Sequence, residues 1–235
     1  MIPAYEPQPA VVDAARGLLE GGLARLVVVD DGSRRPGTAE IFQALRELPR
    51  TEVLVHPQNR GKGAALRTGL AHIQSTAPAG EVGAVTLDAD GQHAVEDVLA
   101  VADELEKHPH ELVLGCRSFT EACVPVPRKI GSVFQRLVTF LLLFKDIRDV
   151  QTGMRGIPFE LFGDLLDIKA DRFEWEMEMI WRCRNHPIRQ IRVQSIYIGK
   201  NESSHFHPVL DTLKFYGRLL GLRLRSLLGA QPLTP

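Results

Sequence analysis

The first half of the chain alternates short apolar runs with longer segments in which apolar residues recur every three or four positions. The short runs are rich in β-branched residues and lie at 24–33, 51–57, 83–90 and 111–118. Such runs are typical of strands that are buried on both faces. The periodic segments, which predict helices, lie at 34–48, 61–73 and 94–109. This alternation predicts an α/β fold with a doubly wound, mainly parallel sheet.

The second half of the chain has a less regular pattern. In order, we predict an apolar helix, a loop or short strand, a helix with acids on one side, an alternating strand and a closing helix, at 132–144, 149–158, 172–186, 188–199 and 212–228. The apolar helix is shorter than the ~20 residues that cross a bilayer, so it belongs either to the core or along a membrane surface. We predict one domain over residues 1–235, with two halves that divide after residue 117.

Composition narrows the possible partners. The net charge of −1 and the pI near 6.7 give no global basic field, so we expect no nucleic-acid partner, and any anion site must be local. Cys116, Cys123 and Cys183 have no CxxC spacing, which predicts reduced thiols in a cytoplasmic protein and no structural zinc. The first residues, MIPAYEPQP, contain neither a basic segment nor an apolar run, so no secretory signal is expected.

Two aspartates follow the predicted strand in the stretch VTLDADGQH. Asp88 and Asp90 lie where a parallel sheet binds its ligands, at the carboxyl end of a strand. Gly91 permits a tight turn that brings the amide oxygen of Gln92 toward the same point. Carboxylate and amide oxygens suit hard cations such as Mg²⁺ or Mn²⁺. The pattern favours a divalent metal site over the alternative, a solvated turn of acids.

Two further strand ends carry polar residues and glycines. Asp30 and Asp31 precede Gly32, an arrangement that suits hydrogen bonds to a base or ribose but also describes an ordinary Asx turn. In NRGKGAAL, Arg60 and Lys62 flank helix-opening glycines, which suits a diphosphate. For Lys62, a solvated surface cation is an equal alternative.

The motifs Tyr5, VVDDGS, NRGKGAALRTG, LDADGQH, GCR and QTGMRG occur in an order that resembles the inverting GT-A glycosyltransferases of family 2. Within that family the chain looks most like the polyprenyl-phosphate sugar transferases, of the dolichyl-phosphate mannose synthase and bacterial undecaprenyl-phosphate type. The resemblance covers nearly the whole chain. It implies the GT-A fold, with nucleotide-sugar binding in residues 1–117 and acceptor binding in residues 118–235, which include the closing helix.

The resemblance also implies roles for individual residues. The metal on the donor diphosphate would be held by Asp88, Asp90 and Gln92. The nucleotide site would be formed by Pro3, Ala4, Tyr5, Glu6, Asp30, Asp31, Gly32, Arg60 and Lys62. Catalysis on the acceptor side would use Arg117 and Arg128, toward the acceptor phosphate, and Asp149 and Gln151, near the sugar, with Arg155 nearby. The chain has YEP where the family usually has YNE, which puts the role of Glu6 in question.

The implied reaction is metal-dependent, inverting transfer of a sugar from a nucleotide diphosphate sugar to a polyprenyl phosphate. We expect a cytoplasmic protein that lies peripherally on the inner face of the membrane. The arginines of the closing helix suit an anionic surface or, alternatively, ordinary solvation. Two other functions stay open: transfer to a soluble hydroxyl compound or glycan, and non-catalytic nucleotide-sugar binding. A hydroxyl acceptor would need a base, for which Asp149 or an acid of FEWEMEM is the candidate.

The remaining polar and apolar residues of the second half have less specific patterns. Glu174, Glu176 and Glu178 alternate, so a helix spreads them over different faces, and we expect most of them to be solvated. We expect the two tryptophans and two of the cysteines to be core or interface residues, at Trp175, Trp181, Cys116 and Cys183.

Overall fold

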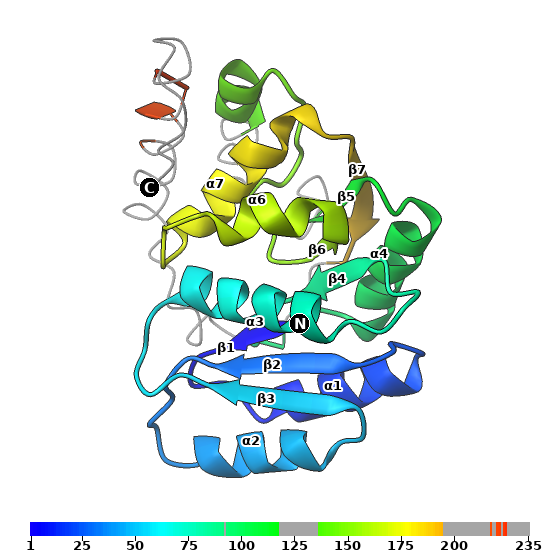
Figure 1. Cartoon of the computed structure of the whole chain (residues 1–235), viewed down its shortest axis with the longest axis vertical. Coiled ribbons are helices and arrows are strands. Elements are labelled where there is room, and N and C mark those ends of the chain that lie inside the picture. Colours follow the sequence, from blue (N-terminus) through cyan, green and yellow to red (C-terminus); the bar gives the residue numbers. More distant parts are fainter. Residues whose placement is uncertain (92, 118–135, 195–216, 218–219, 222, 225–235) are drawn as a thin grey trace.

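The computed structural model describes residues 1–91, 93–117, 136–194, 217, 220, 221, 223 and 224, and within them two hydrogen-bonded sheets form the centre (Figure 1). The first sheet contains β1 (Ile2–Ala4), β2 (Leu26–Asp30) and β3 (Thr51–Val55), all parallel, in that order. The second has the order β4 (Gly83–Thr86), β6 (Arg155–Pro158), β5 (Leu112–Arg117) and β7 (Ile188–Val193). Strand β6 is antiparallel to both of its neighbours, and β5 and β7 are parallel.

The two sheets adjoin between β1 and β4. The Met1 nitrogen donates to the Val85 carbonyl at 2.6 Å, and the Met1 carbonyl accepts from the Leu87 nitrogen at 3.2 Å. This is the pattern of parallel neighbours. The strands other than β6 therefore point the same way, and the carboxyl ends of β1, β2, β4 and β5 share one edge.

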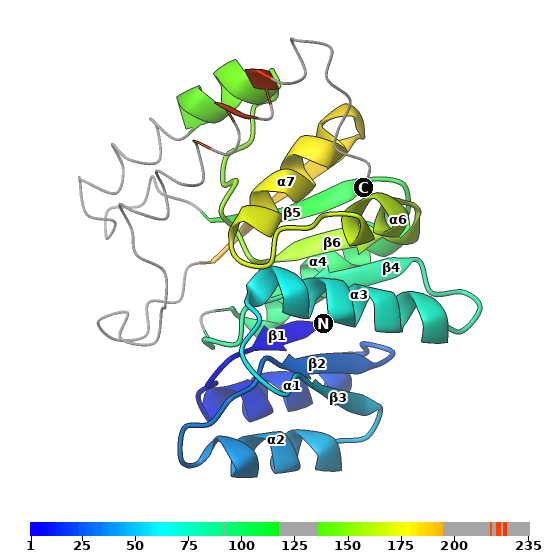
Figure 2. The same ribbon diagram turned by 60° about the vertical axis from the view of Figure 1, so that its left-hand side comes forward.

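Helices cover both faces of the sheets (Figures 1 and 2). One face carries α1 (Ala10–Glu20), α2 (Thr38–Glu47) and α4 (Val95–Lys107), whose apolar residues form one core cluster with β2. The other face carries α3 (Lys62–Thr76), α6 (Phe162–Leu166) and α7 (Glu174–Arg182), which form a second cluster. Short 3₁₀ turns, η1 (Phe159–Leu161) and η2 (Cys183–Asn185), flank the last two helices. The fold is thus α/β and doubly wound, as the sequence predicts.

Most predicted elements are confirmed, with shorter bounds except for α3, which extends beyond the predicted end at residue 73 to Thr76. The prediction left out α1 and α6. Helix α1 has apolar residues at helical spacing and buries Val11, Ala15 and Leu18, so its signal was present in the sequence. Helix α6 has five residues, which is too short for a clear periodic signal. The closing helix at 212–228 lies almost wholly outside the described residues.

The predicted apolar helix is described over residues 136–143. Thr139 and Leu143 are buried against the protein, whereas Leu137, Phe140 and Leu141 are exposed. One edge of this helix therefore belongs to the core, and the other is an apolar surface. Within the described residues, no helix combines the length and hydropathy that a membrane crossing requires.

The core assignments of the second half are confirmed. Trp175 and Trp181 are buried, and so are the free cysteines Cys116 and Cys183. Burial, with nearby carboxylates, raises the pKa of each thiol to about 12. Thiols in this state are poor nucleophiles and metal ligands, so these two act as small apolar side chains. Cys123 lies outside the described residues.

Candidate active site

The predicted site residues gather at the edge where β1, β2, β4 and β5 end. Tyr5 and Glu6 follow β1, and Asp31 follows the last residue of β2. Asp88 and Asp90 lie just beyond β4, and Arg117 is the last residue of β5. Segments far apart in the sequence are thus brought to one end of the sheet, where open α/β folds bind ligands.

The ends of β1 and β2 are joined by hydrogen bonds. Asp30 accepts from the Ser33 nitrogen at 2.8 Å, and the Ser33 hydroxyl accepts from the Glu6 nitrogen at 2.8 Å. The Asp30 carboxylate thus accepts from a residue three positions on, whereas an Asx turn joins residues two positions apart. Pro3 and Ala4 are buried in the strand ladder, whereas Tyr5 is 37 % exposed. Of these three residues, Tyr5, which follows β1, is the most accessible to a ligand.

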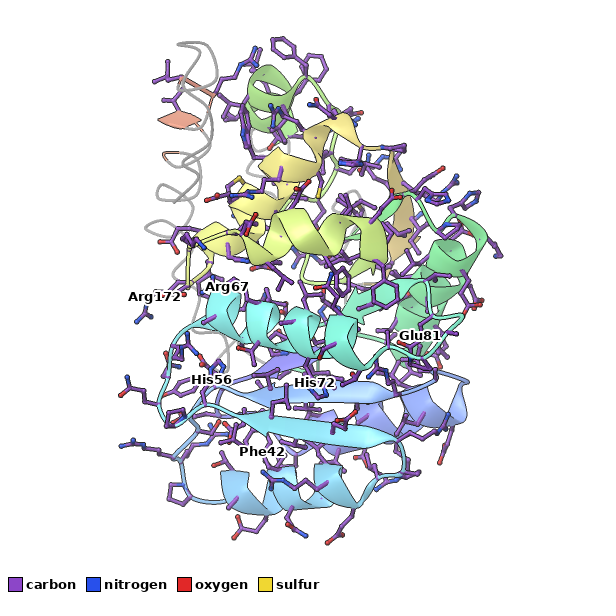
Figure 3. All side chains as sticks on the ribbon, in the orientation of Figure 1. Phe42, His56, Arg67, His72, Glu81 and Arg172 are labelled. Carbon is purple, nitrogen blue, oxygen red and sulfur yellow. The ribbon has the colours of Figure 1, made fainter. Side chains whose placement is uncertain are left out.

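Asp31 is enclosed by the loop that leads into α3. Its two carboxylate oxygens accept from the Arg60 nitrogen at 2.9 Å and from the Gly61 nitrogen at 2.8 Å. His56, labelled in Figure 3 near the start of α3, lies 2.7 Å from Asp31 through Nδ1 and 2.9 Å from Thr68 through Nε2. Asp31 is therefore placed to hold the loop that carries Arg60 and Lys62.

Gly32 allows two loops to approach closely. Its φ of 74° is unfavourable for other residues, and a Cβ at this position would lie 2.5 Å from the Asn59 nitrogen. Gly32 therefore permits a close backbone approach, and the segment that approaches it is the protein's own β3–α3 loop. Arg60, in the same loop, is exposed.

Lys62 is neither solvated nor isolated. Its Nζ lies 2.6 Å from Oδ1 of Asp88 and 3.1 Å from Oε1 of Glu176. The same Glu176 oxygen lies 3.2 Å from Nη1 of the buried Arg155. The alternative of a solvated surface cation is therefore wrong for Lys62. Two cations and two carboxylates form a chain of contacts that links β4, β6, α3 and α7.

The expectation that the acids of FEWEMEM are mostly solvated is also wrong. Glu176 and Glu178 are buried, because α7 is packed into the protein around most of its circumference. Glu178 pairs with Arg182 at 3.2 Å, while Glu174 is half-buried. The signal was available, since Trp175, Met177 and Met179 flank these acids and indicate a helix that is apolar on several faces.

The ion pairs keep these groups charged. Burial opposes ionisation of Asp88, but the nearby Lys62 ammonium group and His93 outweigh it and hold the pKa of Asp88 well below its usual range. Burial likewise favours a neutral Lys62 amine, but the Asp88 and Glu176 carboxylates outweigh it and raise the pKa of Lys62 above its ordinary value. Both side chains therefore carry their charges throughout the neutral range.

The residues around Asp88 fit a hard cation. Asp88 and Asp90 are half-buried and provide carboxylate oxygens. Nε2 of His93 is buried, 3.8 Å from Oδ2 of Asp88, and has no hydrogen-bond partner in the described part of the chain. Among the described residues no cluster of three His, Cys, Asp or Glu side chains could hold a metal alone. The predicted third ligand, Gln92, is an amide and lies outside those residues.

On the acceptor side, Arg117 and Asp149 form a two-point ion pair. Nε of Arg117 lies 2.7 Å from one Asp149 oxygen, and Nη2 lies 3.1 Å from the other. Asp149 is buried, whereas the Arg117 side chain is 37 % exposed. Gln151 is half-buried in the loop before β6, and Arg128 lies outside the described residues. The structure thus brings Arg117 and Asp149 together, with Asp149 orienting the arginine.

Comparison with known proteins identifies the class. Residues 1–166 match the family model of glycosyl transferase family 2, which is more than half of the chain, so the protein belongs to that family. It is a glycosyltransferase, and its α/β fold is the GT-A fold.

Individual relatives show which glycosyltransferases the chain is similar to. The chain is 26 % identical over 249 residues to the UDP-N-acetylglucosamine–dolichyl-phosphate N-acetylglucosaminyltransferase of Methanococcus voltae, covering 97 % of this chain and 96 % of that protein. It is 27 % identical over 255 residues to human dolichyl-phosphate beta-glucosyltransferase, covering 98 % and 76 %. Glucosyl-3-phosphoglycerate synthase of Mycobacterium tuberculosis, solved with Mn²⁺ and UDP-glucose, has a similar fold, with a TM-score of 0.61. The two chains are 19 % identical, and the match covers 98 % of this chain and 78 % of that one.

Proposed function

We propose that this protein transfers a sugar from a nucleotide diphosphate sugar to a polyprenyl phosphate, with inversion at the anomeric carbon and with a divalent metal. The arrangement that carries the proposal is one edge of the sheet, where Asp88 pairs with Lys62 beyond β4 and Arg117 ends β5. The curated relatives from Methanococcus voltae and human support the acceptor, because both are named for transfer to dolichyl phosphate.

The donor side is supported by the carboxylates after β4. Asp88, Asp90 and Gln92 would hold Mg²⁺ or Mn²⁺ on the diphosphate. When bound, that cation offsets the negative charge that builds on the leaving nucleotide. The Mycobacterium tuberculosis neighbour, which shares the fold, was solved with Mn²⁺ and UDP-glucose. Tyr5 and Asp30, at the ends of β1 and β2, are the proposed contacts for the nucleotide.

The acceptor side favours a phosphate over a hydroxyl group. An acceptor phosphate is already an anionic nucleophile, so it needs no strong base. The Arg117 guanidinium, held by Asp149, can present further N–H groups to a phosphate. Of the candidate bases for a hydroxyl acceptor, Glu174 is half-buried at the start of α7, and Asp149, Glu176 and Glu178 are each paired with arginine or lysine. Carboxylates engaged in this way are poorly placed to accept a proton.

Transfer to lipid is the test of this proposal. Purified protein is incubated with Mn²⁺ or Mg²⁺, radiolabelled UDP- or GDP-sugars and a short-chain polyprenyl phosphate. We expect label in the organic phase that depends on all three components. Label in a water-soluble product would establish the soluble-acceptor alternative. Nucleotide binding with no turnover on any acceptor would instead support a non-catalytic binding protein.

An exposed apolar surface supports peripheral contact with the inner face of the membrane. It contains the side chains of Leu137, Phe140, Leu141, Phe144, Leu220 and Leu224. Arginines lie near it: Arg148 is exposed, Arg136 is exposed and paired with Asp146, and the Arg223 guanidinium lies 4.8 Å from the Phe144 ring centroid. Apolar side chains rimmed by arginines suit a surface of anionic lipids.

Replacing Phe140 and Leu141 by serine is expected to lower binding to anionic phospholipid vesicles by at least about tenfold, because full burial of each side chain is worth about 1.5–3 kcal/mol and a tenfold change corresponds to about 1.4 kcal/mol. Cosedimentation with vesicles measures the bound fraction. Val55→Ser is the matched control. Val55 lies on β3, outside the apolar surface, and is 55 % exposed, which is close to the 59 % of Leu141. Equal loss in both variants, or no loss in the double variant, would contradict the membrane assignment.

A further inference from the structure

The chain of contacts around Lys62 is balanced in charge. Lys62 and Arg155 supply two cations, and Asp88 and Glu176 supply two carboxylates. Because Asp88 is half-buried and the other three side chains are largely removed from water, an unbalanced charge here would be costly. Lys62 therefore supplies the positive charge that allows Asp88 to remain ionised at the edge of the sheet.

The contact between Lys62 and Asp88 also makes Lys62 compete with a metal ion for the Asp88 carboxylate. The Lys62 ammonium group lies 2.6 Å from Oδ1 of Asp88, one of the oxygens that would hold a divalent cation. Adding such a cation would put excess positive charge into a balanced and poorly solvated cluster. A diphosphate brings the compensating negative charge. The negative charge of the diphosphate thus offsets the positive charge of the metal, so that each ligand lowers the electrostatic free energy of binding the other at this site.

The surroundings permit the Lys62 side chain to move while its backbone is held. Lys62 is the first residue of α3, and at the neighbouring Gly63 a Cβ would lie 2.5 Å from Cβ of Trp175, so α3 and α7 are in tight contact. The side chain itself is long and flexible. If the ammonium group leaves, Glu176 keeps Arg155 as its partner and is not left as a lone buried carboxylate.

We propose that Lys62 is an internal counter-ion of the donor site: it neutralises Asp88 before ligands bind and moves to the donor's diphosphate when a divalent cation takes its place. Metal and nucleotide then bind cooperatively, because each favours the state in which Lys62 has left Asp88. The inference rests on the proposed function, since it takes Asp88 as a metal ligand.

Binding of Mn²⁺ tests the inference without measuring transfer. The affinity for Mn²⁺ is obtained from the electron paramagnetic resonance signal of free Mn²⁺, first alone and then with saturating UDP, with GDP in a parallel series. For Lys62→Met we expect Mn²⁺ alone to bind on the order of tenfold more tightly than to the wild type, a usual size for such coupling. We also expect the factor by which the nucleotide tightens Mn²⁺ binding to shrink by a similar amount.

Three variants serve as controls. Lys107→Met removes the same charge from an exposed pair with Glu104 and should leave both affinities unchanged. Lys62→Arg keeps the charge and should bind Mn²⁺ alone less tightly than Lys62→Met does, while Lys62→Gln gives a second neutral side chain if Lys62→Met does not fold, as judged by thermal unfolding. Equal Mn²⁺ affinity and equal coupling in the wild type and the neutral variants would overturn the counter-ion role and leave the proposed function standing. Failure of the wild type to bind Mn²⁺ with either nucleotide would overturn the metal site itself.

Discussion

Replacing Asp90 by alanine is expected to lower sugar transfer on the order of 10³-fold, the effect of removing a group that stabilises a developing charge. Asp90 lies beyond the end of β4, so its carboxylate takes no part in the strand ladder. The fold should therefore survive the change. The measurement is the initial rate of label transfer at saturating donor and Mn²⁺, together with the thermal unfolding curve.

Asp103→Ala is the matched control for Asp90→Ala. Asp103 is an exposed carboxylate on α4, so its removal changes the net charge equally but lies on a helix away from the strand ends. We expect a rate close to that of the wild type. A wild-type rate in Asp90→Ala, or in excess chelator, would remove the basis for a metal held after β4.

Glu176→Ala is expected to lower the free energy of unfolding by about 3–5 kcal/mol, because breaking a buried ion pair leaves a charge without compensation. Arg155 would lose its carboxylate partner while fully buried, and Lys62 would lose one of two. Urea unfolding, followed by circular dichroism, measures the loss. We expect an unchanged dependence on urea concentration if the denatured state stays the same.

Glu174→Ala separates the ion pair from the helix charge. Glu174 lies in the same first turn of α7 but is only half-buried, so its replacement removes little more than a favourable interaction with the helix dipole, about 0.3–1 kcal/mol. Similar losses in the two variants would mean that the contacts of Glu176 with Arg155 and Lys62 contribute little to stability.

The sequence predicted where the strands end more reliably than what their terminal residues contact. The run before Asp88 is apolar, and the following glycine marks a turn, so local pattern was enough to place Asp88 and Asp90 at a strand end. The contact between Lys62 and Glu176 joins residues more than a hundred positions apart. It exists because α7 packs on α3, which no local pattern encodes.

The partner of Asp31 was missed for a similar reason. His56 follows β3 directly, and no motif in the sequence indicates a role for it. Since β2 and β3 are parallel neighbours with Asp30 opposite Val55, the next residues of both strands meet, and His56 reaches Asp31. Strand pairing, once known, would have predicted this contact. The exposed side of the 136–143 helix could not be predicted, because periodicity marks apolar residues without saying which of them the protein covers.

The tight seam at the start of α3 has a consequence for engineering. Gly61 and Gly63 lie against the backbone of residues 170–172, and Arg67 donates to the Ala170 carbonyl and pairs with Asp171 at the same place (Figure 3). If residues 1–117 were exchanged with those of a relative, residues 170–176 would therefore have to be exchanged with them. A chimaera joined only at residue 117 would bring unmatched surfaces together at the start of α3. We expect it to give less folded protein, which would prevent measurement of its sugar preference.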